Sequence, residues 1–209
     1  MVANTSVPVA VIGAGHSGLS ASYWLGRHGI EHVVIERGRV AESWREERWD
    51  SLRLLTPNWQ NSLPGSSYDG DDPDGFMTMD GVIQFIADYG SDINAPIVEG
   101  TNVTRVTASV NGYVIETSRG GFEARAVILA SGACNVASLP RFADAMPEGV
   151  PAVHSMHYKN PRQLPKGPVL VVGASATVSW VERTVSRVAV ETGELQATTA
   201  NARINMAIS

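Results

Sequence analysis

The feature that most constrains the fold of this chain is a glycine-rich turn between a short apolar run and a helical stretch. Residues 7–12 form an uncharged, β-branched run, which is typical of a strand buried on both faces. The run leads into Gly13-Ala14-Gly15-His16-Ser17-Gly18, a complete G-x-G-x-x-G. A helical pattern follows and ends near Gly29, and a second apolar strand, His32–Ile35, ends in Glu36. Together these features predict the βαβ unit that binds dinucleotides.

Each residue of this motif has a physical role. Gly13 permits a tight turn out of the strand, and Gly15 lets the backbone approach a pyrophosphate because no Cβ is in the way. Gly18 lets the helix pack closely on the strand, and the helix N-terminus offers unpaired N–H groups to phosphates. Glu36 stands where an acid accepts hydrogen bonds from a ribose, and an acid there repels a 2′-phosphate. We therefore expect this site to hold FAD or NAD rather than NADP.

Composition excludes several other classes of protein. The chain has 209 residues and a net charge of −5, with no block of Lys and Arg, so no nucleic-acid partner is expected. Its single cysteine, Cys134, cannot form an internal disulfide, which favours a reducing cytoplasm. No run of apolar residues is long enough to cross a membrane, and the first residues lack the pattern of a signal peptide.

Further elements follow the first βαβ unit. Thr78–Asp80 predicts the cap of a helix that ends at Gly90, and Leu19, Tyr23 and Trp24 are expected on one face of the first helix. Two hairpin turns, Asn111-Gly112 and Arg119-Gly120-Gly121, predict an antiparallel meander. The strands expected there are Val103–Val106, Tyr113–Thr117 and Phe122–Ala126, with Val127–Ala130 as a separate buried strand. The fold class is thus α/β, with a Rossmann-like parallel sheet and a β-meander.

A second strand-and-turn pattern lies beyond a proline-rich connector. Val169–Val172 runs into Gly173-Ala174-Ser175-Ala176-Thr177-Val178, in which Val178 stands where a third glycine is expected. The pattern predicts an incomplete second nucleotide-binding domain, so we expect domains at residues 1–165 and 166–209. Valines from Val178 to Val188 share one helical face, and no buried strand is expected in Thr192–Ser209.

These residues together resemble the two-dinucleotide-domain flavin-dependent monooxygenases. The group includes flavin-containing monooxygenases, Baeyer–Villiger enzymes and N-hydroxylases. The likeness covers Val7 to about Thr177. Its most specific part is Ser43-Trp44-Arg45 followed by Arg48-Trp49-Asp50-Ser51-Leu52-Arg53-Leu54. Three further segments add to it: Asp72-Pro73-Asp74-Gly75, Ala130-Ser131-Gly132 and His154-Ser155-x-x-Tyr158.

The resemblance implies a set of cofactor contacts. FAD would be held by Gly13, Gly15, Gly18 and Glu36, with Arg37 next to the acid. Trp44 and Arg45 would lie along the flavin, Val103 would present its backbone to the adenine, and the turn at Ala130 and Gly132 would lie by the pyrophosphate. Gly173 and Ser175 would belong to an NADPH site. The implied reaction inserts one oxygen of O₂ into a small organic substrate; no catalytic side chain is evident, and no metal site is expected.

Several of these residues could instead have a purely structural or surface role. Trp44 and Trp49 could fill a core under a loop, Arg45 and Arg48 could be solvated charges, and Cys134 is more simply a small buried hydrophobe. At the level of function, one rival is a non-catalytic flavin-binding fragment or pseudo-enzyme from a truncated or frameshifted gene. Another is a single-domain NAD-binding protein, against which the segment around Trp44 and Arg45 argues.

Overall fold

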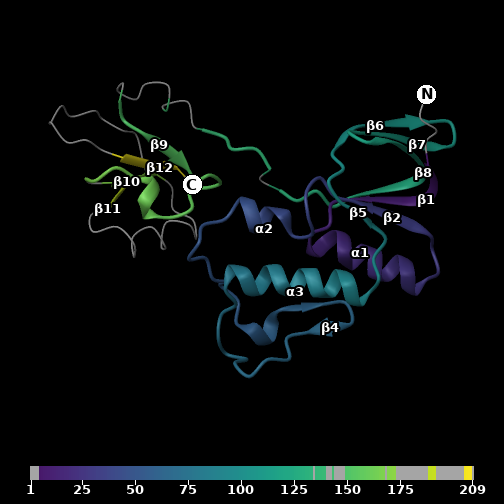
Figure 1. The fold of residues 1–209 in the computed structure, drawn as a ribbon, viewed down its shortest axis with the longest axis horizontal. Helices are drawn as coiled ribbons and strands as arrows, with labels where there is room; N and C mark the ends of the chain where they lie inside the picture. The colour runs from purple at the N-terminus through teal and green to yellow at the C-terminus, as the bar shows by residue number, and fades with distance from the viewer. Residues whose placement is uncertain are drawn as a thin grey trace. The chain divides into compact units, whose positions relative to one another are not determined.

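The computed structural model describes residues 5–133, 135–139, 143, 149–167, 169–172, 188–191 and 205–208 (Figure 1). The chain forms two compact units. Unit 1 comprises Met1–Glu46 and Arg53–Asn135, and unit 2 comprises Glu47–Leu52 and Val136–Ser209. The domain boundary expected at residue 165 stays a prediction.

Unit 1 is built on a six-stranded sheet of order β5-β2-β1-β8-β7-β6. Its strands are β1 (Thr5–Ile12), β2 (His32–Ile35), β5 (Ile97–Val98), β6 (Val103–Ser109), β7 (Gly112–Thr117) and β8 (Gly120–Leu129). Strands β5, β2, β1 and β8 are parallel neighbours, whereas β8, β7 and β6 form the antiparallel meander. The expected parallel sheet with a βαβ unit and a meander is confirmed.

Helices cover one face of this sheet. Helix α1 (His16–Arg27) and helix α3 (Met79–Asp92) lie on the same side of it, as Figure 1 shows. Leu19 of α1 and Ile86 of α3 pack with Val11 and Val34 in one core cluster. On the other face, Val33 and Ile35 pack with residues of the meander, among them Ile115. The alternation along β2 therefore places two cores on opposite faces of one sheet.

Short elements connect these parts. They are α2 (Glu42–Glu46), the 3₁₀ turn η1 (Asn58–Gln60), and the paired strands β3 (Ser62–Leu63) and β4 (Ser66–Ser67). Helix α3 begins at the expected cap, because the Thr78 hydroxyl accepts a hydrogen bond from the Gly81 N–H at 3.2 Å. The helix continues past the expected stop at Gly90 to Asp92.

Two expectations for unit 1 are wrong. Residues 127–129 do not form a separate strand: they are the last three residues of β8, which pairs with β1 in one register from Phe122 to Leu129. Trp24 does not share the buried face of Leu19, since its side chain is 54% exposed. Tyr23 takes the inner position, and Trp24 packs edge-on against its ring at a centroid distance of 5.2 Å.

Unit 2 contains a four-stranded parallel sheet of order β11-β10-β12-β9. The strands are β9 (Ala152–His154), β10 (Val169–Val172), β11 (Val188–Glu191) and β12 (Asn205–Ile208), and a 3₁₀ turn, η3, spans Pro161–Gln163. Strand β10 was expected. Strands β11 and β12 correct the prediction that Val188 closes a helical face and that no strand follows: pairing with β10 decided these short segments, in which local propensity is weak.

Candidate functional site

The glycine turn after β1 is packed without room for side chains at two of its glycines. Gly13 has φ +108°, and a Cβ there would lie 2.4 Å from the carbonyl oxygen of Ala130. A Cβ on Gly18 would lie 1.9 Å from the carbonyl oxygen of Gly13. The end of β1, the end of β8 and the start of α1 are thus in direct backbone contact, as the roles of the first and third glycines predict.

Gly15, the middle glycine, has a different environment. It is the N-cap residue of α1, and a Cβ on it would meet no atom within 4 Å. No side chain caps the helix at this end, and its first turn carries no acid. The first N–H groups of α1 and the positive end of its dipole therefore remain available to an anion next to Gly15.

The Glu36 carboxylate lies at the end of β2 and is bound to the backbone on both sides. Its side chain is buried, with the residue 7% exposed. One oxygen, Oε2, accepts a hydrogen bond from the Ala14 N–H at 2.7 Å, and Oε1 accepts one from the Gly38 N–H at 2.9 Å. The acid is thereby fixed against the glycine turn, and each oxygen keeps a further lone pair for a hydroxyl donor.

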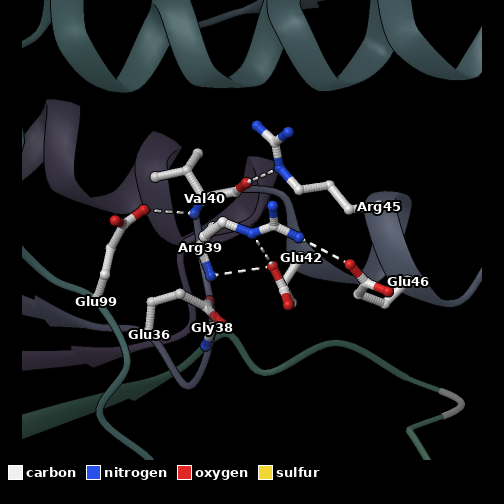
Figure 2. A network of polar contacts seen from close by, with 8 residues as sticks. All are labelled: Glu36, Gly38, Arg39, Val40, Glu42, Arg45, Glu46 and Glu99. Atoms are coloured by element: carbon white, nitrogen blue, oxygen red, sulfur yellow. Dashed lines mark hydrogen bonds and ion pairs between the residues drawn. The ribbon is translucent and has the colours of Figure 1, made fainter.

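A second segment, Glu99–Thr101, holds the backbone that follows Glu36. The Thr101 N–H donates to the Glu36 carbonyl oxygen at 2.8 Å, and the Gly100 N–H donates to the Gly38 carbonyl oxygen at 2.9 Å. The Glu99 carboxylate accepts a hydrogen bond from the Val40 N–H at 2.8 Å (Figure 2). The loop from Glu36 to Val40 is therefore held from both ends and the middle.

The loop continues into α2 through a network of charged side chains (Figure 2). Glu42 Oε2 accepts from both the backbone N–H and the Nε of Arg39, each at 3.1 Å. Glu46 pairs with the same guanidinium at 2.7 Å, and Arg45 Nε donates to the Val40 carbonyl oxygen at 3.1 Å. Arg39 and Glu46 are well exposed and Glu42 is partly exposed, so the network orients the loop more than it stabilises the fold.

The structure brings most of the predicted site residues of unit 1 together. Ala41 donates its N–H to the Ala14 carbonyl oxygen, which places the start of α2 at the glycine turn. Trp44 packs against the core cluster that includes residues of α1 and α3, so the alternative that it is a core residue also holds. Arg45 lies on α2. Arg37 is exposed between Glu36 and Gly38, Val103 begins β6, and Ala130 and Gly132 lie in the turn after β8. Gly173 and Ser175 lie outside the described residues, as does Cys134.

Unit 2 contains its own polar contacts. The Asp50 N–H donates to the Lys159 carbonyl oxygen at 2.8 Å, and its carboxylate accepts a hydrogen bond from Asn160 Nδ2 at 2.7 Å. Tyr158 is buried nearby with its hydroxyl unpaired, and burial, followed by the Asp50 charge, raises its pKa. Burial also lowers the pKa of His154, with a smaller contribution from His157. The motifs around Asp50 and Tyr158 are thus brought together in one unit.

Several residues of the site escaped the sequence analysis. Glu42 follows Arg39 by only three residues and begins α2, so the sequence spacing alone allows this ion pair. Glu99 and Gly100 contact a loop about sixty residues earlier in the chain, so no local pattern indicates them. Their position could have been inferred only from the pairing of β5 with β2.

No helix among the described residues is both long and apolar enough to cross a bilayer. Likewise, within the part of the chain that the structure describes, no three His, Cys, Asp or Glu side chains are grouped so as to hold a metal ion.

Comparison with known proteins agrees with this geometry. Residues 10–179 match the pyridine nucleotide-disulphide oxidoreductase family. An uncharacterized oxidoreductase CzcO-like of Geobacillus kaustophilus is 37% identical over 169 residues, which are 80% of this chain and 48% of that protein. The indole-3-pyruvate monooxygenase YUCCA1 of Oryza sativa subsp. japonica is 29% identical over 174 residues, 81% of this chain and 43% of the relative. The chain therefore spans about half the length of the curated relatives it matches.

A solved structure extends the likeness to three dimensions. The flavin-containing monooxygenase from Stenotrophomonas maltophilia matches with a TM-score of 0.80 and 27% identity, over 94% of this chain and 61% of that one. The resemblance to flavin-dependent monooxygenases is confirmed, and the chain belongs to the pyridine nucleotide-disulphide oxidoreductase family.

Proposed function

We propose that unit 1 binds FAD and that the chain is the flavin-binding part of an NADPH-dependent monooxygenase. The observation that carries the proposal is the geometry at Gly15. The turn is closely packed at Gly13 and Gly18 but open at Gly15, beside the uncapped N-terminus of α1. An opening limited to the middle glycine suits a pyrophosphate, which needs backbone N–H groups and no intervening side chain.

The residues around this opening fit the rest of the cofactor. Glu36 would accept hydrogen bonds from the adenosine ribose, and its charge disfavours a 2′-phosphate, which argues for FAD over NADP at this site. Val103 would offer its backbone to the adenine, and Trp44 and Arg45 would border the flavin. Ala130 and Gly132 would border the pyrophosphate from the end of β8, which already contacts Gly13.

The chemistry would come from the cofactor, with the protein supplying position and protection from water. FAD, once bound, supplies the redox centre, for which NADPH would be the reductant and O₂ the oxidant. OTEMO, a protein of similar fold, forms a complex with FAD and NADP. We propose Gly173 and Ser175 as part of an NADPH site, and a small organic molecule as the substrate.

Titration of the purified chain with FAD tests the proposal, with Gly15→Val as the critical variant. We expect wild type to bind FAD and Gly15→Val to lose binding by steric exclusion from the pyrophosphate. Since a Cβ at Gly15 meets nothing within 4 Å, the unliganded variant should fold, with only the modest loss of stability that valine causes at a helix N-cap. Gly26→Val, on the same helix and also with nothing within 4 Å, is the matched control and should bind FAD normally. Normal FAD binding by Gly15→Val would show that this turn is not the phosphate site.

A separate measurement distinguishes an enzyme from a non-catalytic flavin-binding protein. Consumption of NADPH by the FAD-loaded chain at about 1 s⁻¹ or more would lie in the usual range of enzymes. A chain that binds FAD but leaves NADPH unconsumed would support the non-catalytic alternative.

A further inference from the structure

One cation, Arg119, lies beside the segment that holds the loop after Glu36, and its guanidinium has no ion-pair partner among the described residues. It belongs to the turn between β7 and β8 and is exposed. Among the described residues, no carboxylate or carbonyl pairs with its guanidinium. By contrast Arg105, on the neighbouring β6, pairs with Glu116 at 3.7 Å.

Backbone and side-chain contacts fix the turn that carries Arg119. Its own N–H donates to the Thr117 hydroxyl at 3.1 Å, and that hydroxyl donates to the Gly120 carbonyl oxygen at 2.8 Å. Ser118 and Asn102 are joined by two hydrogen bonds, of 2.8 and 3.0 Å. The turn is therefore held against the start of β6, where Val103 pairs with Thr117.

The guanidinium lies beside Gly100. If Gly100 carried a Cβ, that atom would be 3.1 Å from Nη2, 3.4 Å from Cζ and 3.6 Å from Nη1 of Arg119. Because three atoms of the group are at similar distances, the guanidinium approaches Gly100 with its flat side rather than its edge. Gly100 also has φ +62°, so glycine is favoured there on two counts.

Gly100 connects this cation to the ribose acid. Its N–H binds the Gly38 carbonyl oxygen, and the Gly38 N–H binds Glu36 Oε1. Arg119 thus borders the same loop as the acid proposed to hold the ribose, and it lies at the same end of the meander as Val103, whose backbone is proposed to meet the adenine. Guanidinium groups stack favourably on aromatic faces, and adenine offers such a face.

We infer that Arg119 is an adenosine-binding residue, whose guanidinium stacks on the adenine ring of the bound dinucleotide. The inference rests on the proposed FAD site and deepens it. The contact needs the planar group, a free face and the vacant side of Gly100, all of which the structure supplies.

Titrations of full-length Arg119→Met and Arg105→Met with FAD and with ADP test this inference. ADP carries the adenosine and pyrophosphate without the flavin. We expect Arg119→Met to weaken both ligands by the same factor, about three- to thirtyfold, and Arg105→Met to leave both affinities unchanged. Both variants should unfold at the wild-type temperature without ligand, because each removes only an exposed charge from a meander that keeps its backbone contacts.

The outcomes separate the two proposals. Unchanged FAD and ADP affinity in Arg119→Met, with normal binding by wild type, would overturn the role of Arg119 and leave the FAD site intact. Weakening of FAD without weakening of ADP would also overturn it, since the contact would then not be to adenosine. If wild type bound neither ligand, both proposals would be wrong.

Discussion

Two glycines of helix α1 differ in what surrounds them. Their substitution by alanine should therefore change the free energy of unfolding in opposite directions. A Cβ on Gly18 would lie 1.9 Å from the Gly13 carbonyl oxygen, so Gly18→Ala must separate α1 from the turn. We expect the free energy of unfolding to fall by roughly 1–3 kcal/mol or more, as in other overpacked sites. The Cβ of Gly26→Ala would meet nothing within 4 Å. This substitution should raise the free energy of unfolding by about 0.5–1 kcal/mol, because alanine favours the helix. Urea unfolding of both variants measures the difference, and equal stabilities would contradict the packing described here.

Glu36 has a structural role and a proposed binding role, and Glu36→Gln tests both. A control variant that removes an exposed negative charge elsewhere accounts for the effect of net charge. The amide would offer one oxygen and one NH₂ group to two backbone N–H donors, so one of the bonds to Ala14 and Gly38 is lost. We expect FAD affinity to fall by about 1.5–3 kcal/mol at most, the range for hydrogen bonds to charged groups, with a smaller fall in stability. Glu31→Gln, at an exposed acid in the turn before β2, is the control. Unchanged FAD affinity in Glu36→Gln would place the ribose contact elsewhere.

The turn after β9 shows how an element can fix the protonation of one residue. His154 Nδ1 accepts a hydrogen bond from the Met156 N–H at 3.2 Å, which requires a deprotonated Nδ1. Burial lowers the pKa of His154, and the charge of His157, whose ring centroid is 6.2 Å away, lowers it further. Below the ordinary value of about 6.5, the unfolded chain takes up a proton that the folded chain resists. The stability contributed here is therefore present above that pH and is lost as the pH falls through the folded pKa.

An NMR titration of the imidazole protons tests this assignment. We expect the His154 midpoint below about 6.5. In His157→Gln the midpoint should rise, because a repelling charge is removed while the burial remains. A midpoint above the ordinary value in wild type would show that His154 is not held as the neutral acceptor.

Elements differ in how far the sequence predicts them. The first βαβ unit was predictable because each boundary carries a specific residue: at the C-terminus of α1, Gly29 and Ile30 donate to the Gly26 and Leu25 carbonyl oxygens, as a helix-stopping glycine does. The length of β8 was not predictable from the sequence. Its continuation through residue 127 depends on pairing with β1 rather than on local residues. Strand β11 shows the same limit, since its valines suit a strand or a helical face until β10 supplies a partner.

The site divides in the same way. The glycines and Glu36 follow from a compact motif whose spacing reflects the ligand that it fits. The hydrogen bonds from residues 99–101 to the loop after Glu36, and the approach of Arg119 to Gly100, depend on which strands are neighbours in the sheet. Trp24 was misplaced because adjacent residues on a helix point about 100° apart, and only the packing of Tyr23 shows which of the two faces inward.

At the scale of the whole molecule, the division into two compact units predicts that FAD stabilises the chain unevenly. A ligand stabilises the folded state that binds it, by about 2.7 kcal/mol at a concentration one hundred times its dissociation constant. All proposed FAD contacts among the described residues lie in unit 1, from the glycine turn to the start of β6 and the end of β8. Hydrogen exchange should therefore slow by up to about a hundredfold in peptides from β1, β2 and β6.

Peptides from β9 and β10 in unit 2 should keep their exchange rates in the same samples, because the proposed site gives FAD no contact there. Riboflavin is the matched control ligand, since it carries the flavin ring without the pyrophosphate and adenosine that the glycine turn and Glu36 would bind. It should protect neither unit to a comparable degree. Equal protection of both units by FAD would show that they unfold as one cooperative body. Protection of unit 2 alone would contradict the proposal that FAD binds unit 1.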